Sequence, residues 1–421
     1  MSTGSLRAPT LERRGLSNLR RRLPVVLGGG CLVAIALVTV SVWQAAERAR
    51  SPIEPPGAWG ALYWLAVASA FALYVVGAWL IRSRGAPVRV VVILAIAIQL
   101  VPLAAPLLYS TDSYTYWSYG RIQAVHDGNP YVNPPSEWPD DPAYALMGAQ
   151  WHDTTSAYGP LWTVTSAGVA KAAGDSPDTA AWLFKAIAAL SSVALVLAAV
   201  ALAPPGRKAF AAAFVGWNPV LALQFAGGGH NDTLMMALPL AGMAVAARGR
   251  PNLGAAFWPV AIVVKWLPLI FLPLLVARDR KAFGWKGLAI SGVAVALVST
   301  LLYGVHWVHA AAPISSQLRR ASSTSIPYYV EKWFGLPQYR VTEVLAVLFA
   351  LAYLWLLRQA WRGNARLGLT AGLFCLSLSW LPSWYVAWPV SLTAVEEDRT
   401  ARWVSLGLTA WLLRDAVAMP W

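Results

Sequence analysis

The sequence predicts an all-α polytopic membrane protein. Of its 421 residues, 57% are hydrophobic and 12% are charged, against roughly 25% charged in a soluble domain. Apolar stretches of about twenty residues, the length of a bilayer-spanning helix, recur along the whole chain. Short clusters of Arg and Lys separate these stretches, so the formal charge of +14 indicates orientation in a membrane and excludes a nucleic-acid-binding face.

The first 23 residues form a basic tail, with six arginines before the apolar run from Leu23 to Ala45. This run is too long for a signal peptide and lacks a small-residue cleavage site, so we expect an uncleaved first span with a cytoplasmic N-terminus. Residues 1–23 are interpreted as a cytoplasmic tail and residues 24–421 as a single transmembrane domain. Cys31 and Cys375 both fall in predicted spans, which indicates neither a disulfide nor a metal site.

The number of Lys and Arg residues in the short loops sets the expected orientation of each span. Two long loops, 110–177 and 305–338, then lie on the external side, and residues 160–173 in the first of them are expected to form an interfacial helix. Residues 253–277 begin and end at basic clusters, so they are expected to form a hairpin, either re-entrant or made of two compressed spans broken at Lys265–Pro268. Eleven spans are predicted, at 24–45, 58–81, 88–109, 178–203, 208–226, 233–247, 285–304, 340–357, 367–381, 385–395 and 402–418.

Three positively charged residues and one carboxylate stand out from this pattern. Asp112 is expected where the third span meets external water, which makes it a candidate base. Arg319 and Arg320 lie on the side that disfavours basic residues, where they could contact lipid headgroups or grip an anionic ligand such as phosphate. Lys265 lies within an apolar stretch, where a charge costs at least ~2.5 kcal/mol. It either snorkels to the interface or lines a protein cavity.

These residue types fit transfer of a lipid-borne phosphosugar to a hydroxyl acceptor. A carboxylate can take the proton of the attacking hydroxyl, and cations can stabilise the charge on the leaving phosphate. Aromatic side chains near the outer ends of the spans can stack on sugar rings, although an interfacial aromatic belt accounts for many of them. A donor embedded in the membrane would need no soluble nucleotide-binding domain.

Seven motifs, in order along the chain, resemble the GT-C superfamily and, within it, the polyprenol-phosphate-mannose-dependent α-1,6-mannosyltransferases of lipomannan synthesis in actinobacterial envelopes. They are D-S-Y-T-Y-W-S-Y-G-R (112–121), G-N-P-Y (128–131), Y-G-P-L-W (158–162), W-N-P (217–219), G-H-N-D (229–232), V-K-W-L-P-L-I-F-L-P (264–273) and W-Y-V-A-W-P (384–389).

The resemblance implies a GT-C-type multispan helical bundle in the bacterial plasma membrane, with interfacial helices in its long first external loop. It implies that Asp112 is catalytic and that a β-linked mannosyl phosphate is converted to an α-mannoside by an inverting single displacement. The expected substrate-binding residues are Tyr116, Trp117, Arg121, Tyr131, Tyr158, His230, Asn231, Asp232, Lys265, Arg319, Arg320, Trp384 and Tyr385.

The chain departs from the family pattern in its acidic motif, which is a single Asp112 without D-x-D. Asp140 and Asp141 lie beside prolines in the same loop and are interpreted as a solvated turn. No cofactor is expected. The missing D-x-D argues against a tightly bound divalent metal, but dependence on a divalent metal stays open.

The expected partners are a polyprenyl-phosphate-linked sugar donor, a glycolipid or glycan acceptor and membrane lipids, without nucleic acid. Three alternatives stay open. The first is an arabinofuranosyl- or glucosyltransferase of the same superfamily. The second is a lipid-linked glycan flippase or other transporter, which would need a polar path across the whole bilayer. The third is a non-enzymatic assembly partner.

Overall fold

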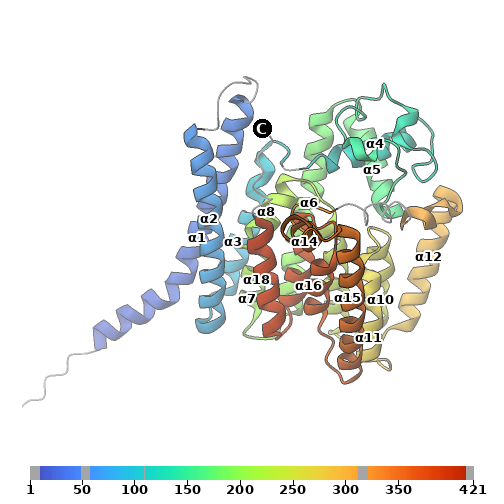
Figure 1. Cartoon of the computed structure of the whole chain (residues 1–421). Coiled ribbons are helices and arrows are strands. Elements are labelled where there is room, and N and C mark those ends of the chain that lie inside the picture. The colour runs from blue at the N-terminus through green and yellow to red at the C-terminus, as the bar shows by residue number, and fades with distance from the viewer. Residues whose placement is uncertain (1–9, 49–56, 109, 312–320, 414–421) are drawn as a thin grey trace, which may run out of the picture.

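The computed structural model describes residues 10–48, 57–108, 110–311 and 321–413, and these residues form helices and turns without a β-strand (Figure 1). Five of the helices are long and apolar enough to cross a bilayer. They are α1 (Thr10–Arg48), α2 (Gly57–Arg84), α6 (Pro177–Leu202), α12 (Trp285–Tyr303) and α15 (Gln338–Trp361). The predicted class, an all-α polytopic membrane protein, is confirmed.

A sixth candidate span is bent by 54° where α7 (Lys208–Gly216) gives way to α8 (Pro219–Ala222) and the π-helical turn η4 (Leu223–Gly227). Proline cannot donate the helical hydrogen bond at this point, and the Asn218 side chain caps the new helix instead. The motif Trp217–Asn218–Pro219 therefore forms a break within the predicted span 208–226. The fully buried Trp217 packs inside the bundle against Gly28 and Gly77.

The remaining apolar helices among the described residues are shorter, so five of the eleven predicted spans, or six with the bent one, are helices long and apolar enough to cross a bilayer. Apolar composition alone does not distinguish one long helix from two short ones joined at a break. The shorter helices of the bundle are α3 (Val88–Leu100) with η1 (Val101–Ala104), α9 (Asp232–Ala246), α16 (Leu367–Ser377), η7 (Ser383–Val386), α17 (Ala387–Thr393) and α18 (Arg399–Leu413).

Residues 251–278 form the hairpin that the sequence predicts. Its arms are α10 (Pro251–Ile262) on one side and η5 (Leu267–Ile270) with α11 (Leu272–Arg278) on the other, and Lys265 lies in the break between them. A Cβ added at Gly284 would lie 2.1 Å from the Pro251 carbonyl oxygen. The chain therefore returns after α11 to the end of the bundle at which α10 begins.

Basic residues from distant parts of the chain meet at one end of the bundle. Arg82 and Arg207 lie 2.6 and 2.9 Å from the Glu397 carboxylate. Arg366 lies 2.6 Å from Asp398. The clusters that were expected to share the cytoplasmic side thus share one end of the molecule.

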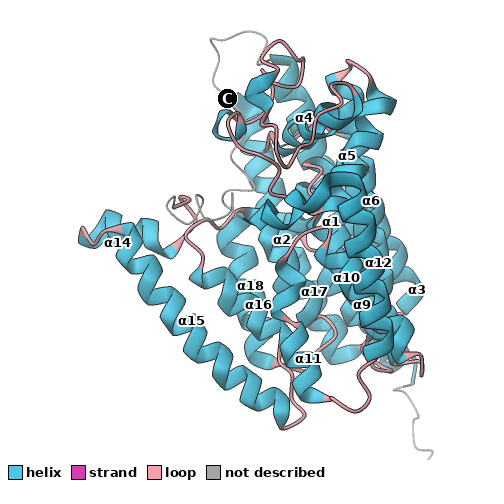
Figure 2. Cartoon of the chain, turned by 90° about the vertical axis from the view of Figure 1, so that its right-hand side faces the viewer, coloured by secondary structure: helices cyan, strands magenta, loops and turns pink. Residues whose placement is uncertain are grey.

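A head of short helices covers the opposite end of the bundle. It contains α4 (Asp112–Ala124), η2 (Pro135–Glu137), η3 (Ala149–Trp151) and α5 (Pro160–Ala173), and Figures 1 and 2 show α4 and α5 above the long helices. The predicted helix at 160–173 is confirmed as α5. Beyond η6 (Gly304–Ala311), the short helix α14 (Ile326–Phe334) lies at the upper end of α15 (Figure 2).

Candidate functional site

Asp112 is the first residue of α4, where the helix N-terminus favours a carboxylate. The sequence interpretation put it at the end of a span, but the chain leaves helical structure after Ala104 and begins a new helix at Asp112. The Asp112 side chain is 15% exposed, and its Oδ2 lies 3.4 Å from Nδ1 of the fully buried His230. Asp112 can therefore meet a substrate while one of its oxygens faces a buried imidazole.

Asp232 opens α9 and has no exposed surface. Lys265 donates to both of its oxygens, at 2.9 and 3.1 Å. The Trp388 indole donates to Asp232 Oδ1 at 2.7 Å. Lys265 is thus a paired charge that lines the protein interior, and the reading in which it snorkels to the interface is wrong.

Aromatic rings from η7 and α17 pack against His230 and Lys265. Trp384 stacks on the His230 ring, with centroids 3.7 Å apart and planes at 17°. Tyr385 stacks on Trp388 at 3.8 Å, and the Lys265 ammonium lies 4.7 Å from the Tyr385 ring centroid, within cation–π range. The sequence interpretation missed Trp388, although its position four residues after Trp384 places both on one face of a helical segment.

Tyr116 and Tyr158 extend this aromatic surface into the head. Tyr116 lies one helical turn after Asp112, is almost fully buried, and meets Tyr158 edge to face at 4.8 Å. The next residue, Gly159, donates its N–H to the carbonyl oxygen of Val264. A Cβ at Gly159 would lie 2.3 Å from the Val263 carbonyl oxygen, so only glycine allows the head to approach the Lys265 hairpin this closely.

Two of the expected substrate-binding residues, Trp117 and Arg121, are engaged within the head. Arg121 donates from Nε to both oxygens of Asp141, at 2.8 and 2.9 Å. Its Nη1 lies 2.8 Å from Asp175, and its guanidinium lies 5.2 Å from the ring centroid of the fully buried Trp117. These contacts stabilise the head. The Arg121 guanidinium is already paired with Asp141 and Asp175.

The structure corrects the interpretation of Asp141 that was drawn from the sequence. It does not belong to a solvated turn, because its side chain is 5% exposed and is bonded to Arg121 and His126. Burial alone would raise the pKa of the Asp141 carboxyl, but the hydrogen bonds from Arg121 and His126 outweigh burial and hold this pKa below its usual value. The adjacent Asp140 is exposed, as expected.

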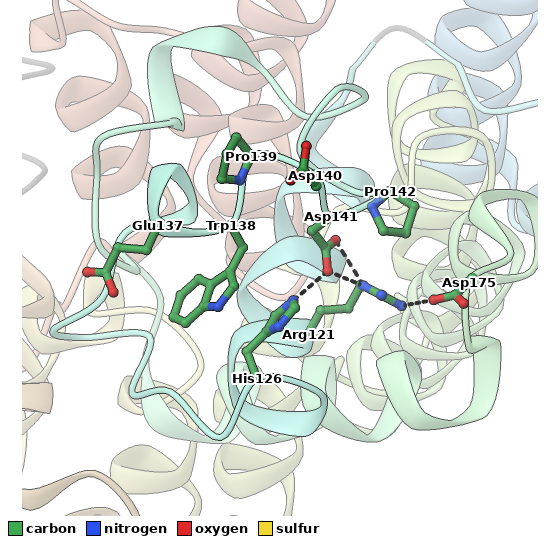
Figure 3. Close-up of a pocket in the computed structure, with 9 residues that line it drawn as sticks. All are labelled: Arg121, His126, Glu137, Trp138, Pro139, Asp140, Asp141, Pro142 and Asp175. Atoms are coloured by element: carbon green, nitrogen blue, oxygen red, sulfur yellow. Dashed lines mark hydrogen bonds and ion pairs between the residues drawn. The ribbon is translucent and has the colours of Figure 1, made fainter.

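A cavity of about 510 Å³ lies beside this ion pair, and Figure 3 shows the residues that line it. Its lining is Arg121, His126, Glu137, Trp138, Pro139, Asp140, Asp141, Pro142 and Asp175. None of the residues that surround Asp112 and Lys265 belongs to this lining, so the cavity is separate from the candidate site.

Tyr131 and Asn231 are also placed by the structure. The Tyr131 hydroxyl donates to the Tyr158 carbonyl oxygen at 2.9 Å, and its ring packs edge-on against Tyr303. Tyr131 therefore supports Tyr158 from behind. Asn231 lies between His230 and Asp232, is 1% exposed, and neither of its amide atoms has a hydrogen-bond partner among the described residues.

Lys185, on α6, is a buried charge that the sequence interpretation missed. Its ammonium contacts the backbone carbonyl oxygens of Leu103, Ala105 and Pro106. Carbonyl dipoles at the end of η1 thus hold the cation, and the stretch that leads into Asp112 is fixed in place. Its signal in the sequence was a lysine inside a predicted span.

Arg319 and Arg320 lie outside the described residues, so their expected role stays a prediction. Within the described part of the chain, no group of three or more His, Cys, Asp or Glu side chains is arranged to hold a metal ion. The arrangement consists of one partly exposed carboxylate, one paired ammonium and a set of aromatic faces, which together can deprotonate a hydroxyl, contact an anion and hold a ring.

Residues 25–278 match the family model described as "Alpha-(1->6)-mannopyranosyltransferase, N-terminal domain". Alpha-(1->6)-mannopyranosyltransferase A of Mycobacterium tuberculosis is 25% identical over 354 residues, which are 73% of this chain and 67% of that protein. Alpha-(1->6)-mannopyranosyltransferase A of Corynebacterium glutamicum is 30% identical over 183 residues, which are 42% of this chain and 36% of that protein. The chain thus spans about two thirds of the first relative and little more than a third of the second. The matched region contains Asp112, Asp232 and Lys265.

Proposed function

Because this chain belongs to the alpha-(1->6)-mannopyranosyltransferase family, we propose that it is a membrane glycosyltransferase. It moves a mannosyl residue from a polyprenyl phosphate donor to a lipid-linked or glycan acceptor. One observation carries the proposal: the partly exposed carboxylate of Asp112 and the Lys265 ammonium contact His230 and Asp232, which are two residues apart. A base and a cation are thus brought to one site beneath the head.

The position of the cation supports a donor carried on a membrane lipid. Lys265 is at the tip of an apolar hairpin, and its side chain is 18% exposed. A phosphate carried on a membrane lipid can reach such a site without leaving the bilayer, and an ammonium donates charge-assisted hydrogen bonds to its oxygens. Asp232 keeps Lys265 charged and in position. Arg319 and Arg320 are proposed as further phosphate contacts.

The reaction is a single displacement at the anomeric carbon. Asp112 accepts the proton of the acceptor hydroxyl while that oxygen forms its bond to the anomeric carbon. The bond from this carbon to the phosphate oxygen breaks on the opposite face, and the phosphate leaves with the electron pair beside Lys265. Attack opposite to the leaving group inverts the configuration, so a β-linked donor gives an α-mannoside.

The aromatic residues are proposed to hold the sugars. Trp384 and Tyr385 lie beside His230 and Lys265, so a mannosyl ring between the base and the phosphate would lie along their faces. Tyr158, which is partly exposed and packs edge to face on the buried Tyr116, offers a second surface on the side of the head. Asn231 is proposed to bond a sugar hydroxyl, because its buried amide has no partner among the described residues.

The site is proposed to face the external side of the plasma membrane, with the N-terminus in the cytoplasm. The end of the bundle that carries Arg82, Arg207 and Arg366 is the one that the positive-inside tendency assigns to the cytoplasm. The head lies at the other end (Figure 1), and its Gly159 donates to the Val264 carbonyl oxygen beside Lys265.

The test is transfer in native membranes or detergent, with synthetic polyprenyl phosphomannose as donor and an α-mannoside as acceptor. We expect a product one mannose longer, with a new α linkage. Parallel reactions with polyprenyl phosphoarabinofuranose and polyprenyl phosphoglucose test the sugar. Transfer from one of these donors but not from the mannosyl donor would refute mannose as the sugar. Donor movement between leaflets without any product would support a transporter instead.

A further inference from the structure

His230 is a buried imidazole with very few polar neighbours. It has no exposed surface, and within the described part of the chain neither ring nitrogen has a hydrogen-bond partner. Among the residues that the structure describes, the Asp112 carboxylate, 3.4 Å from Nδ1, is the only acidic group within ion-pair distance of it. This separation is slightly longer than a good N–H···O bond, so a small movement of Asp112 brings the two groups into hydrogen-bond range.

Packing fixes the plane of the His230 ring. Trp384 stacks on one face at 3.7 Å, and Phe225 meets the ring edge to face at 6.5 Å. A Cβ added at Gly228 would lie 3.1 to 3.2 Å from ring atoms, so the ring also fits closely against this glycine. The imidazole therefore has little freedom to turn Nδ1 away from Asp112.

The backbone that carries His230 is tied to the first turn of α4. Ser113, the residue after Asp112, donates its hydroxyl to the Gly228 carbonyl oxygen at 3.2 Å. Gly229 has a φ of +75°, and a Cβ there would lie 2.4 Å from Ser113 Oγ. The positions of Asp112 and His230 are thus set relative to each other by a turn that requires glycine.

We propose that His230 is a positioning residue for Asp112: its Nδ1–H donates to Oδ2 and thereby aims Oδ1 at the acceptor hydroxyl. This inference rests on the proposed role of Asp112 as the base. A carboxylate can rotate about its last bond, and a base that is free to rotate spends less time in the productive orientation. Fixing one oxygen through a rigid donor removes that freedom and leaves the other oxygen for the proton.

Two substitutions separate the donor function of His230 from its packing. His230→Phe keeps a ring to stack on Trp384 but removes Nδ1–H. His230→Asn loses the ring but places an amide N–H about where Nδ1 lies. Both variants, with the wild type, are assayed for transfer from polyprenyl phosphomannose, and their thermal unfolding in detergent is measured to compare only folded protein.

We expect His230→Phe to fold and to lower kcat roughly 10- to 100-fold, the loss of one hydrogen bond to a charged group, with KM for both substrates within about twofold. His230→Asn should recover most of this loss in kcat. If His230→Phe keeps wild-type kcat, or if Asn is no better than Phe, the positioning role is overturned. The base assignment itself is tested separately by Asp112→Asn, so a failure of either claim can be recognised.

Discussion

Lys265 and the fully buried Asp232 form an ion pair, with Nζ 2.9 Å from Oδ1, although one lies in a hairpin break and the other at the start of α9. Removing one partner of a buried pair leaves an uncompensated charge. The pair therefore links stability and substrate binding, and an experiment on Lys265 must separate the two.

Lys265→Met should lower the free energy of unfolding by about 3–5 kcal/mol, because Asp232 remains buried without a partner. Lys265→Met combined with Asp232→Asn removes both charges and should recover most of that stability. The double variant should still show a roughly 10- to 100-fold higher KM for the donor. Thermal unfolding and donor titration measure the two effects, and Lys171→Met, at an exposed lysine in α5, is the control. A normal donor KM in the double variant would make Lys265 purely structural.

Asp112→Asn should fold normally and lose transfer by ~10²-fold or more, because an amide of the same shape cannot accept the hydroxyl proton. The measurement is the initial rate of mannosyl transfer at saturating donor and acceptor. Asp140→Asn, at an exposed carboxylate in the head, should leave the rate unchanged. Near-normal turnover in Asp112→Asn would require another base, and Asp232 would be examined next.

Asp141→Asn should destabilise the head by ~1–3 kcal/mol, since Arg121 would lose its charged partner. The folded pKa of Asp141 is lowered, so the stabilisation is complete above the usual carboxyl pKa of about 3.9 and is lost as the pH falls through the lower folded value. Thermal unfolding of both proteins across this acidic range should show the gap between them closing as the pH falls. A gap that is independent of pH would contradict the ion-pair explanation.

Gly159→Ala should impair transfer without removing any functional group. The added methyl would lie 2.3 Å from the Val263 carbonyl oxygen, so the head must move away from the Lys265 hairpin. A displacement of about 1 Å can cost roughly 10²-fold in rate. Gly168→Ala in α5 is the matched control, because nothing lies within 4 Å of its Cβ position. Equal activity of the two variants would show that the contact between head and hairpin does not matter.

Single cysteines test the orientation of the bundle in the membrane. A cysteine at position 140, in the head, should react with an impermeant thiol reagent added outside intact cells, and one at position 280 should react only after permeabilisation. Both positions are exposed, and the native Cys31 and Cys375 are buried. Labelling in the opposite pattern would place the candidate site in the cytoplasm.

Much of this architecture could be predicted from composition and local pattern. The helical class, α5 and the hairpin around Lys265 each follow from apolar length, proline position and basic flanks. The number of continuous spans did not follow, because breaks such as Trp217–Asn218–Pro219 are stabilised by packing and capping inside the bundle. Local composition shows neither this packing nor this capping.

The sequence predicted those site residues whose type and surroundings by themselves indicate a chemical role. Asp112 and Lys265 stand out because a charge is rare in apolar surroundings. Asp141 was misread because its neighbours resemble a solvated turn, whereas in the structure it is paired with Arg121 of α4 and its side chain is buried. The Trp388 hydrogen bond to Asp232 joins residues 156 positions apart, and no single-sequence pattern reports such a contact.

The wide spacing of these contacts has a consequence for synthesis. Trp388 is synthesised about 120 residues after Lys265. The growing chain therefore contains Asp232 and Lys265 before the aromatic residues that pack around them. The site can become complete only after the segment containing η7 and α17 has been synthesised. A nascent chain stopped short of Trp384 would hold the acid and the cation without the rings that enclose them.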